Sequence, residues 1–152
     1  MSYNNIRKAS GKMIEYTKSS TQSVSSGDTI TFDTKRTTGG DSVSINGSGI
    51  ISLNSSKSYW IQASIAINMS SNGDYKVTFQ DSSGNNLSES AGVFPAYHTL
   101  SPDDDGNPFT NSSYMASLVV DNPSLDYKLV VTSIPASSTI RTETHLFIME
   151  ME

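Results

Sequence analysis

Apolar and polar residues alternate along several short stretches of this chain, which predicts β-strands with one buried face. In DYKVTFQD, residues 74–81, Tyr75, Val77 and Phe79 alternate with polar residues, as in an antiparallel strand that covers a core. Strand-like runs occupy residues 23–34, 41–47, 48–55, 58–69, 74–81, 115–122, 125–134 and 143–150. Gly, Asn, Asp and Pro separate these runs, so the pattern predicts an all-β fold of antiparallel strands, either a sandwich or a barrel.

The last run, in THLFIMEME, is apolar on both faces. Leu146 and Ile148 point to one side of the expected strand, while His145, Phe147 and Met149 point to the other. A strand of this kind is either central in a large core or packed against another chain.

The run SYWIQASIAINM, residues 58–69, raises the same question. Its isoleucines form one apolar face, whereas Trp60 and Gln62 begin a second face that is small and uncharged. Depletion of charge beside an aromatic residue is typical of the centre of an interface. The other interpretation is a central strand covered by a loop of its own chain.

A long connection follows residue 81, and it predicts an edge strand over residues 91–97 and then an exposed loop. The acidic triplet in SPDDDGNPF offers oxygen ligands that suit Ca²⁺, but its spacing differs from a calcium-binding loop, so a solvated acidic turn is the alternative. Nearby aromatic residues suit a sugar-stacking or protein-binding tip, or else belong to the core. The candidate ligand loop therefore comprises Tyr97, Asp103, Asp105, Phe109 and Tyr114.

Composition narrows the class of protein. The chain has 152 residues, which suits one domain, and no cysteine, which excludes disulfides and thiol chemistry. No apolar stretch is long enough for a membrane span or has the form of a signal peptide. We therefore expect a soluble protein with no membrane partner.

Charge is distributed unevenly along the chain, whose net charge is −5. The first twenty residues hold four cations, Arg7, Lys8, Lys12 and Lys18, against the single acid Glu15. These cations lack interleaved aromatic residues, so nucleic acid is not an expected partner. We predict an N-terminal attachment arm over residues 1–20 and a β domain over residues 21–152; a merely solvated terminus is the alternative.

Catalytic residues are not evident. A hydrolytic triad needs a nucleophile, an imidazole and an orienting carboxylate, and the two histidines, His98 and His145, lie far apart in the sequence. NGSGI, residues 46–50, lacks the Gly-x-Ser-x-Gly arrangement of a nucleophile elbow. We expect no enzymatic activity, no cofactor and no metal centre.

The order of GDTITFDT, INGSGIISL, SYWIQASIAI, DYKVTFQD, LDYKLVVTSI and THLFIMEME resembles the jelly rolls of tumour necrosis factor and of complement globular heads. The similarity spans about residues 24–151 and rests on apolar spacing. It implies an antiparallel jelly-roll β-sandwich that assembles as a homotrimer, with the last strand beside the threefold axis. The trimer interface implied in this way comprises Trp60, Gln62, His145, Phe147 and Met149.

The chain also differs from secreted cytokines of that class, because it has no signal peptide, no cysteine and no collagen-like stalk, and its composition is rich in Asn and Ser. In these respects it is similar to small structural proteins of tailed bacteriophages. That likeness implies a capsid decoration or head fibre protein on the virion surface, made in the host cytoplasm and bound to the major capsid protein or another virion protein. The alternative is a fibre head that binds a receptor or a host glycan.

Overall fold

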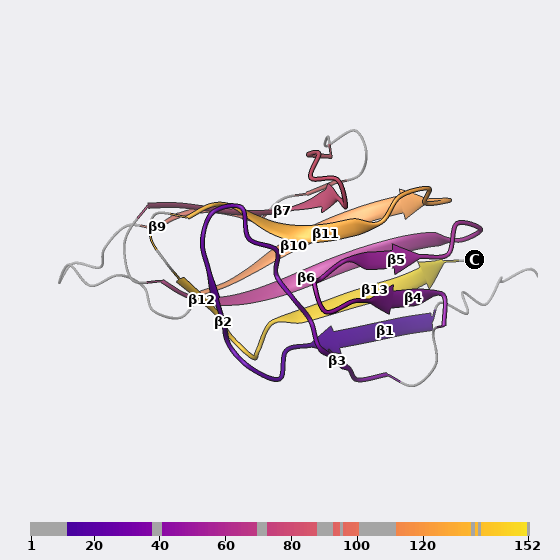
Figure 1. Cartoon of the computed structure of the whole chain (residues 1–152), viewed down its shortest axis with the longest axis horizontal. Coiled ribbons are helices and arrows are strands. Elements are labelled where there is room, and N and C mark those ends of the chain that lie inside the picture. The colour runs from indigo at the N-terminus through magenta and orange to yellow at the C-terminus, as the bar shows by residue number, and fades with distance from the viewer. Residues whose placement is uncertain are drawn as a thin grey trace, which may run out of the picture.

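The computed structural model describes residues 12–37, 41–69, 73–87, 93–94, 96–100, 112–134, 136 and 138–151. Within these residues the chain forms thirteen β-strands. They are arranged in two antiparallel sheets that lie face to face (Figure 1). The predicted all-β sandwich is confirmed.

The eight-stranded sheet is built around its longest strand, β6 (Ser58–Met69). One edge of β6 pairs with β10 along its length, and the other edge pairs first with β13 and then with β12. Further strands extend the sheet on both sides. The remaining members are β1 (Lys12–Thr17), β2 (Gln22–Val24), β3 (Thr34–Lys35), β8 (Val93–Phe94), β10 (Ser112–Asp121), β12 (Ser138–Ile140) and β13 (His145–Met151).

The second sheet has five strands in the order β4, β5, β11, β7, β9. Its longest pairing joins β7 and β11, with a register shift near Val131. Its members are β4 (Val43–Ile45), β5 (Ile51–Leu53), β7 (Gly73–Asp81), β9 (Ala96–Leu100) and β11 (Tyr127–Ser133).

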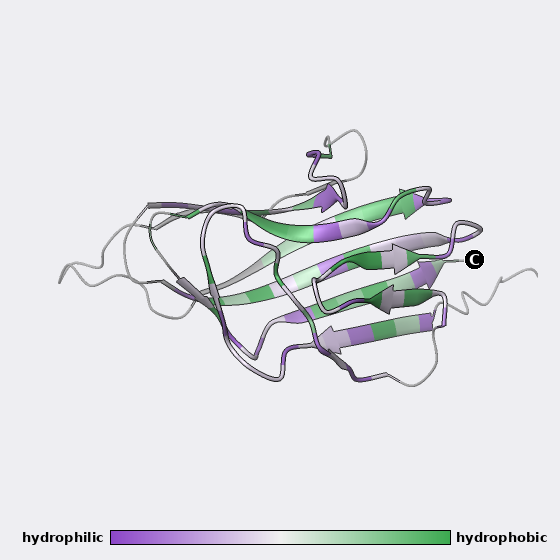
Figure 2. Cartoon of the chain, viewed as in Figure 1, coloured by the Kyte–Doolittle hydropathy of each residue, from purple (hydrophilic) through white to green (hydrophobic). Residues whose placement is uncertain are grey.

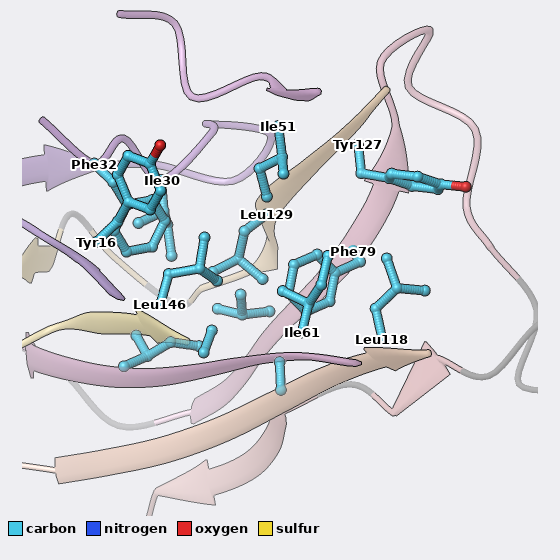
Figure 3. Packing of buried hydrophobic residues seen from close by; sticks show 14 of the residues in the cluster. Tyr16, Ile30, Phe32, Ile51, Ile61, Phe79, Leu118, Tyr127, Leu129 and Leu146 are labelled. Carbon is cyan, nitrogen blue, oxygen red and sulfur yellow. The ribbon is translucent and has the colours of Figure 1, made fainter. Parts of the chain in front are cut away.

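The core lies between the two sheets and is made of aliphatic and aromatic side chains (Figure 3). Ile61, Leu118 and Leu146 come from the eight-stranded sheet, and Phe79 and Leu129 come from the five-stranded sheet. Each of these side chains is at most 1% exposed. Because every fully buried side chain of this size contributes about 1.5–3 kcal/mol, this shared layer is the main source of stability.

The alternation that predicted the strands is visible as bands of hydropathy along them (Figure 2). In β13, Leu146 and Ile148 are completely buried, whereas Phe147 and Met149 are only half-buried on the opposite face. The prediction that the last strand divides its apolar residues between the core and a second face is confirmed.

Strand β1 corrects the expected boundary of the N-terminal arm, because residues 12–18 belong to the folded body. β1 pairs with β13 from Lys12 opposite Glu150 to Thr17 opposite His145. Ile14 and Tyr16 on β1 are buried in the core. The four cations of the first twenty residues favoured a free arm, but the alternation of Ile14 and Tyr16 places this segment in the sheet.

The predicted strand over residues 23–34 is divided in two by a crossing between the sheets. After β2 the chain turns at Gly27, whose φ is +95°, and the Ile30 amide donates a hydrogen bond of 2.8 Å to the Leu129 carbonyl of β11. It then returns to the first sheet, where the Asp33 amide donates to the Thr17 carbonyl at 3.1 Å. Ile30 is buried as expected, although it lies outside a regular strand.

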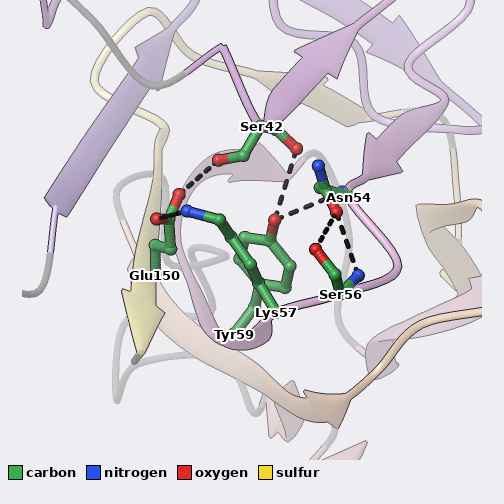
Figure 4. Close-up of polar contacts among 6 residues, drawn as sticks. All are labelled: Ser42, Asn54, Ser56, Lys57, Tyr59 and Glu150. Carbon is green, nitrogen blue, oxygen red and sulfur yellow. Dashed lines mark hydrogen bonds and ion pairs between the residues drawn. The ribbon is translucent and has the colours of Figure 1, made fainter.

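A polar cluster joins the C-terminal strand to the five-stranded sheet (Figure 4). The Glu150 carboxylate, which is buried, accepts hydrogen bonds from the Lys57 ammonium and the Ser42 hydroxyl. The Tyr59 hydroxyl accepts a hydrogen bond of 3.2 Å from the Asn54 amide and donates one of 3.4 Å to the Ser42 carbonyl. The bonds from Lys57 and Ser42 hold the pKa of Glu150 below its usual value.

Gly49 occupies a position that only glycine suits. Its φ is +79°, and a Cβ there would lie 2.8 Å from the Ile30 carbonyl oxygen and 2.9 Å from Thr29 Cγ2. We expect Gly49→Ala to lower the free energy of unfolding by roughly 2 kcal/mol or more, because it combines left-handed strain with a backbone clash. Urea denaturation measures this difference. Gly47→Ala is the matched control, since a Cβ at Gly47 meets no atom within 4 Å; equal losses in both variants would contradict the prediction.

Candidate functional site

The outer face of the eight-stranded sheet carries an apolar row that crosses four strands. The register places Val119 of β10 opposite Trp60 of β6, Trp60 opposite Met149 of β13, and Met149 opposite Met13 of β1. Residues opposite one another in an antiparallel pair point to the same side of the sheet. All four side chains therefore point away from the core, and we call them the apolar row.

The apolar row faces solvent to a degree that is unusual for such residues. Met13 is 58% exposed, Val119 is 44% exposed and Trp60 is 41% exposed. None of the described segments covers them. Single exposed apolar side chains are common on protein surfaces, whereas several gathered on one face are typical of an interaction surface.

A shallow hollow of about 220 Å³ lies within this face. It is lined by Met13, Trp60, Gln62, Phe147 and Met149. The methionines and the two aromatic rings give it apolar walls, and Gln62 supplies an amide at one side. The hollow can accept an apolar side chain of a protein that docks on the sheet.

Two further rows of outward-facing residues lie beside the apolar row, and they contain both polar and apolar side chains. Phe147 is opposite Gln62 on one side and Glu15 on the other, and the next row holds Met115 and His145. The Gln62 Nε2 atom lies 3.0 Å from the Met115 sulfur. Met115 itself is 65% exposed, so the apolar surface extends onto β10.

His145 and Glu15 form a pair on this face. The His145 Nδ1 atom lies 2.7 Å from the Glu15 Oε1 atom, and both side chains are partly buried. The imidazole ring stacks on Phe147 with a centroid separation of 5.8 Å and an interplanar angle of 5°. The contact with the Glu15 carboxylate and the stacking on Phe147 thus hold the imidazole in place.

The structure brings the five predicted interface residues together. Trp60 and Gln62 lie on β6, and His145, Phe147 and Met149 lie on the neighbouring strand β13. Sequence reasoning missed the rest of the face, which comprises Met13, Glu15, Met115 and Val119. The alternation in MASLVV was a usable signal, because Ala116 and Leu118 are buried and their neighbours must point outward.

The four cations assigned to capsid attachment are in different situations. Arg7 and Lys8 lie outside the described residues, and Lys12 is exposed at the start of β1. Lys18 is only 6% exposed, and its ammonium donates to the Gln22 Oε1 atom at 2.9 Å and to the Thr31 carbonyl at 2.6 Å. Burial lowers the pKa of Lys18, an effect that Asp33 opposes. The assignment of Lys18 to attachment is therefore wrong, because its ammonium is buried and bound to acceptors within the domain.

The candidate ligand loop lies largely outside the described residues. This applies to Asp103, Asp105 and Phe109. Tyr97 belongs to β9 of the five-stranded sheet and Tyr114 to β10 of the eight-stranded sheet, so the strands that flank the loop belong to different layers. Its proposed role stays a prediction.

In the described part of the chain, no three acidic, histidine or cysteine side chains gather as a metal site would require, and no helix is long and apolar enough to span a membrane. An open cleft of about 540 Å³ lies near Asp33 and Asn46. The Asp33 carboxylate accepts two hydrogen bonds of 2.8 Å from Ser19, and Asn46 Oδ1 accepts hydrogen bonds from two backbone amides of its own turn, so these lining groups already have partners within the chain.

Comparison with known proteins shows the fold. No protein-family model and no curated protein sequence matches the chain. Among solved structures, Eiger TNF from S. frugiperda is 8% identical with a TM-score of 0.68, and the match covers 93% of each chain. Murine APRIL at pH 8.0 is 10% identical with a TM-score of 0.61, covering 93% of this chain and 99% of that one.

The globular domain of zebrafish complement 1qA is 9% identical with a TM-score of 0.54, covering 91% of this chain and 94% of that domain. The resemblance inferred from apolar spacing is thus confirmed at the level of the fold. The chain has the jelly-roll fold of the tumour necrosis factor and complement globular domains.

Proposed function

We propose that this chain is a non-enzymatic structural protein that assembles as a homotrimer on the surface of a tailed bacteriophage particle, as a capsid decoration or head fibre protein. The observation that supports the assembly is that the apolar row and the hollow that its residues help to line form an apolar face, which none of the described segments covers. The jelly-roll fold that the chain shares with these domains supports the same arrangement, because the resemblance noted in the sequence implies a homotrimer.

Burial of this face supplies the driving force for assembly. Each large apolar side chain that moves from water into an interface contributes about 1.5–3 kcal/mol before the costs of association are subtracted. Met13, Trp60, Met115 and Val119 are the most exposed members of the face, so they have the most surface to lose. A closed ring of three copies buries the face in every subunit and leaves none uncovered.

The virion role rests on composition and on analogy with phage jelly rolls. The chain lacks cysteine and is rich in Asn, Ser and Gly, so no disulfide contributes to its stability. Docking would use the two basic residues that precede β1, Arg7 and Lys8, against an acidic surface of the major capsid protein or another virion protein. Three copies in a trimer add avidity to a contact that is weak in one copy.

The attachment is tested by co-sedimentation with empty capsids of the virus that encodes the chain. We expect the wild-type protein to bind and the bound fraction to fall as salt rises, because the contact is between opposite charges. The double variant Arg7→Glu/Lys8→Glu should lose most of its binding while remaining folded. Lys76→Glu, on β7 of the five-stranded sheet, reverses a charge outside the N-terminal segment of the sequence and should bind normally.

One outcome would contradict attachment through Arg7 and Lys8, and another would contradict the capsid function itself. Undiminished binding by the double variant would show that the body of the domain makes the contact. Absence of capsid binding, together with binding to host cells that is lost in Asp103→Asn/Asp105→Asn, would favour the alternative of a receptor- or glycan-binding fibre head.

A further inference from the structure

The pair formed by His145 and Glu15 lies on the apolar face, not on the solvent rim of the domain. Its two side chains are linked at 2.7 Å, and the imidazole is stacked on Phe147, which itself lines the hollow. A face that docks on another copy would remove this pair from water. Removal from water makes the net charge of the pair decisive, because burial of an uncompensated charge is costly.

We propose that trimer assembly takes up protons at His145, so that the trimer is favoured as the pH falls from 8 to 6. This inference rests on the proposed trimer and concerns its regulation. When His145 is neutral, each subunit buries the Glu15 carboxylate without a charged partner in contact with it, and the assembly holds three such carboxylates. When His145 is protonated, every pair is neutral overall and its hydrogen bond joins two ions.

The charged groups around the pair support this sign. On β6 the residue opposite His145 is the uncharged Ser64, and on β1 it is Thr17. Arg36, whose amide donates to the Glu15 carbonyl at 2.9 Å, follows Glu15 in the same outward-facing row, but its side chain is exposed and makes no ion pair with Glu15. Glu143, in the turn before β13, is paired with Arg141 at 2.5 Å. Glu15 is therefore the acidic partner that His145 meets on this face.

The direction follows from proton linkage. If the assembled state binds more protons than the separate subunits, the association constant increases as the pH decreases. We expect the protein concentration at half-assembly to be about tenfold lower at pH 6 than at pH 8, a coupling of ordinary size for linked sites. Sedimentation equilibrium at a series of pH values measures it directly.

Two variants distinguish this pair from a general effect of the net charge of −5, which also becomes less negative in acid. His145→Gln keeps a donor for Glu15 but cannot take up a proton near neutrality, so the dependence on pH should largely disappear. Glu15→Gln should reverse the dependence, because protonation of His145 would then bury a cation without a partner. A uniform charge effect cannot change sign in one variant.

His98→Gln is the matched control, because His98 lies on β9 of the five-stranded sheet and is the other histidine of the chain. It should retain the wild-type dependence on pH. A trimer whose assembly responds to pH equally in the wild type, His145→Gln and Glu15→Gln would overturn this inference and leave the trimer intact. A wild-type protein that is monomeric at every pH and concentration would overturn the trimer itself, and this inference with it.

Discussion

Replacing Phe147 with aspartate should convert the proposed trimer to a folded monomer, with the mass in light scattering falling to the 16.4 kDa of a single chain. Phe147 lines the hollow on the apolar face and lies opposite Glu15 in the register. An aspartate there would place a second carboxylate beside Glu15 in each subunit, inside a surface that assembly removes from water. Burial of an unpaired charge costs several kcal/mol per ion, and the apolar contacts of Phe147 are lost at the same time.

Ile148, the next residue along β13, provides a comparison because neighbouring residues of a strand point to opposite faces of the sheet. Ile148 is completely buried on the other face of β13, so Ile148→Asp should prevent folding. Ser44→Asp adds the same charge at an exposed position on β4 and should leave the trimer unchanged. A Phe147→Asp protein that stays trimeric would place the interface elsewhere, and one that unfolds as Ile148→Asp does would show that Phe147 serves the fold.

Deleting residues 1–20 should unfold the domain, whereas deleting residues 1–11 should leave its melting temperature nearly unchanged. The longer deletion removes β1, which is paired with β13 at six positions and buries Ile14 and Tyr16. Those two side chains alone contribute about 3–6 kcal/mol, a large part of the 5–15 kcal/mol that stabilises a typical domain. The longer deletion also removes Lys18, whose ammonium donates hydrogen bonds to the Gln22 side chain and the Thr31 carbonyl.

Circular dichroism with thermal melting measures both deletions. A stable protein lacking residues 1–20 would mean that the domain folds without β1. Residues 1–20 would then form an arm, as the charge distribution predicted. A marked loss of stability on removal of residues 1–11 would mean that those residues contribute to the fold.

The periodicity of apolar residues was sufficient to predict the main strands. Tyr75, Val77 and Phe79 are all fully buried, and Leu146 and Ile148 face the core while Phe147 faces outward. These predictions succeeded because a regular strand leaves a side chain few directions to take. The same logic indicated the second face at Trp60, since a charge-free outer face on a central strand has little reason to exist in water.

Tertiary context decided the features that periodicity did not reveal. The residues of β1 were assigned to an arm because the cations of this segment were given more weight than the alternation of Ile14 and Tyr16. Strand β12 was not predicted because three residues are too few to show a period. Lys18 is buried because Gln22 and Thr31, which follow it along the chain, fold back to supply acceptors. The pairing of Glu15 with His145 joins residues 130 positions apart, and only the register between β1 and β13 brings them together.

Trp60 is the single tryptophan of the chain, and it stands on the apolar row rather than in the core. The protein therefore contains its own optical reporter, since indole emission shifts to shorter wavelength when water leaves its surroundings. In a chain whose tryptophan was buried, emission would follow unfolding. Here it should follow contact between subunits, so dilution of the unlabelled protein would produce a red shift in fluorescence before any strand is lost.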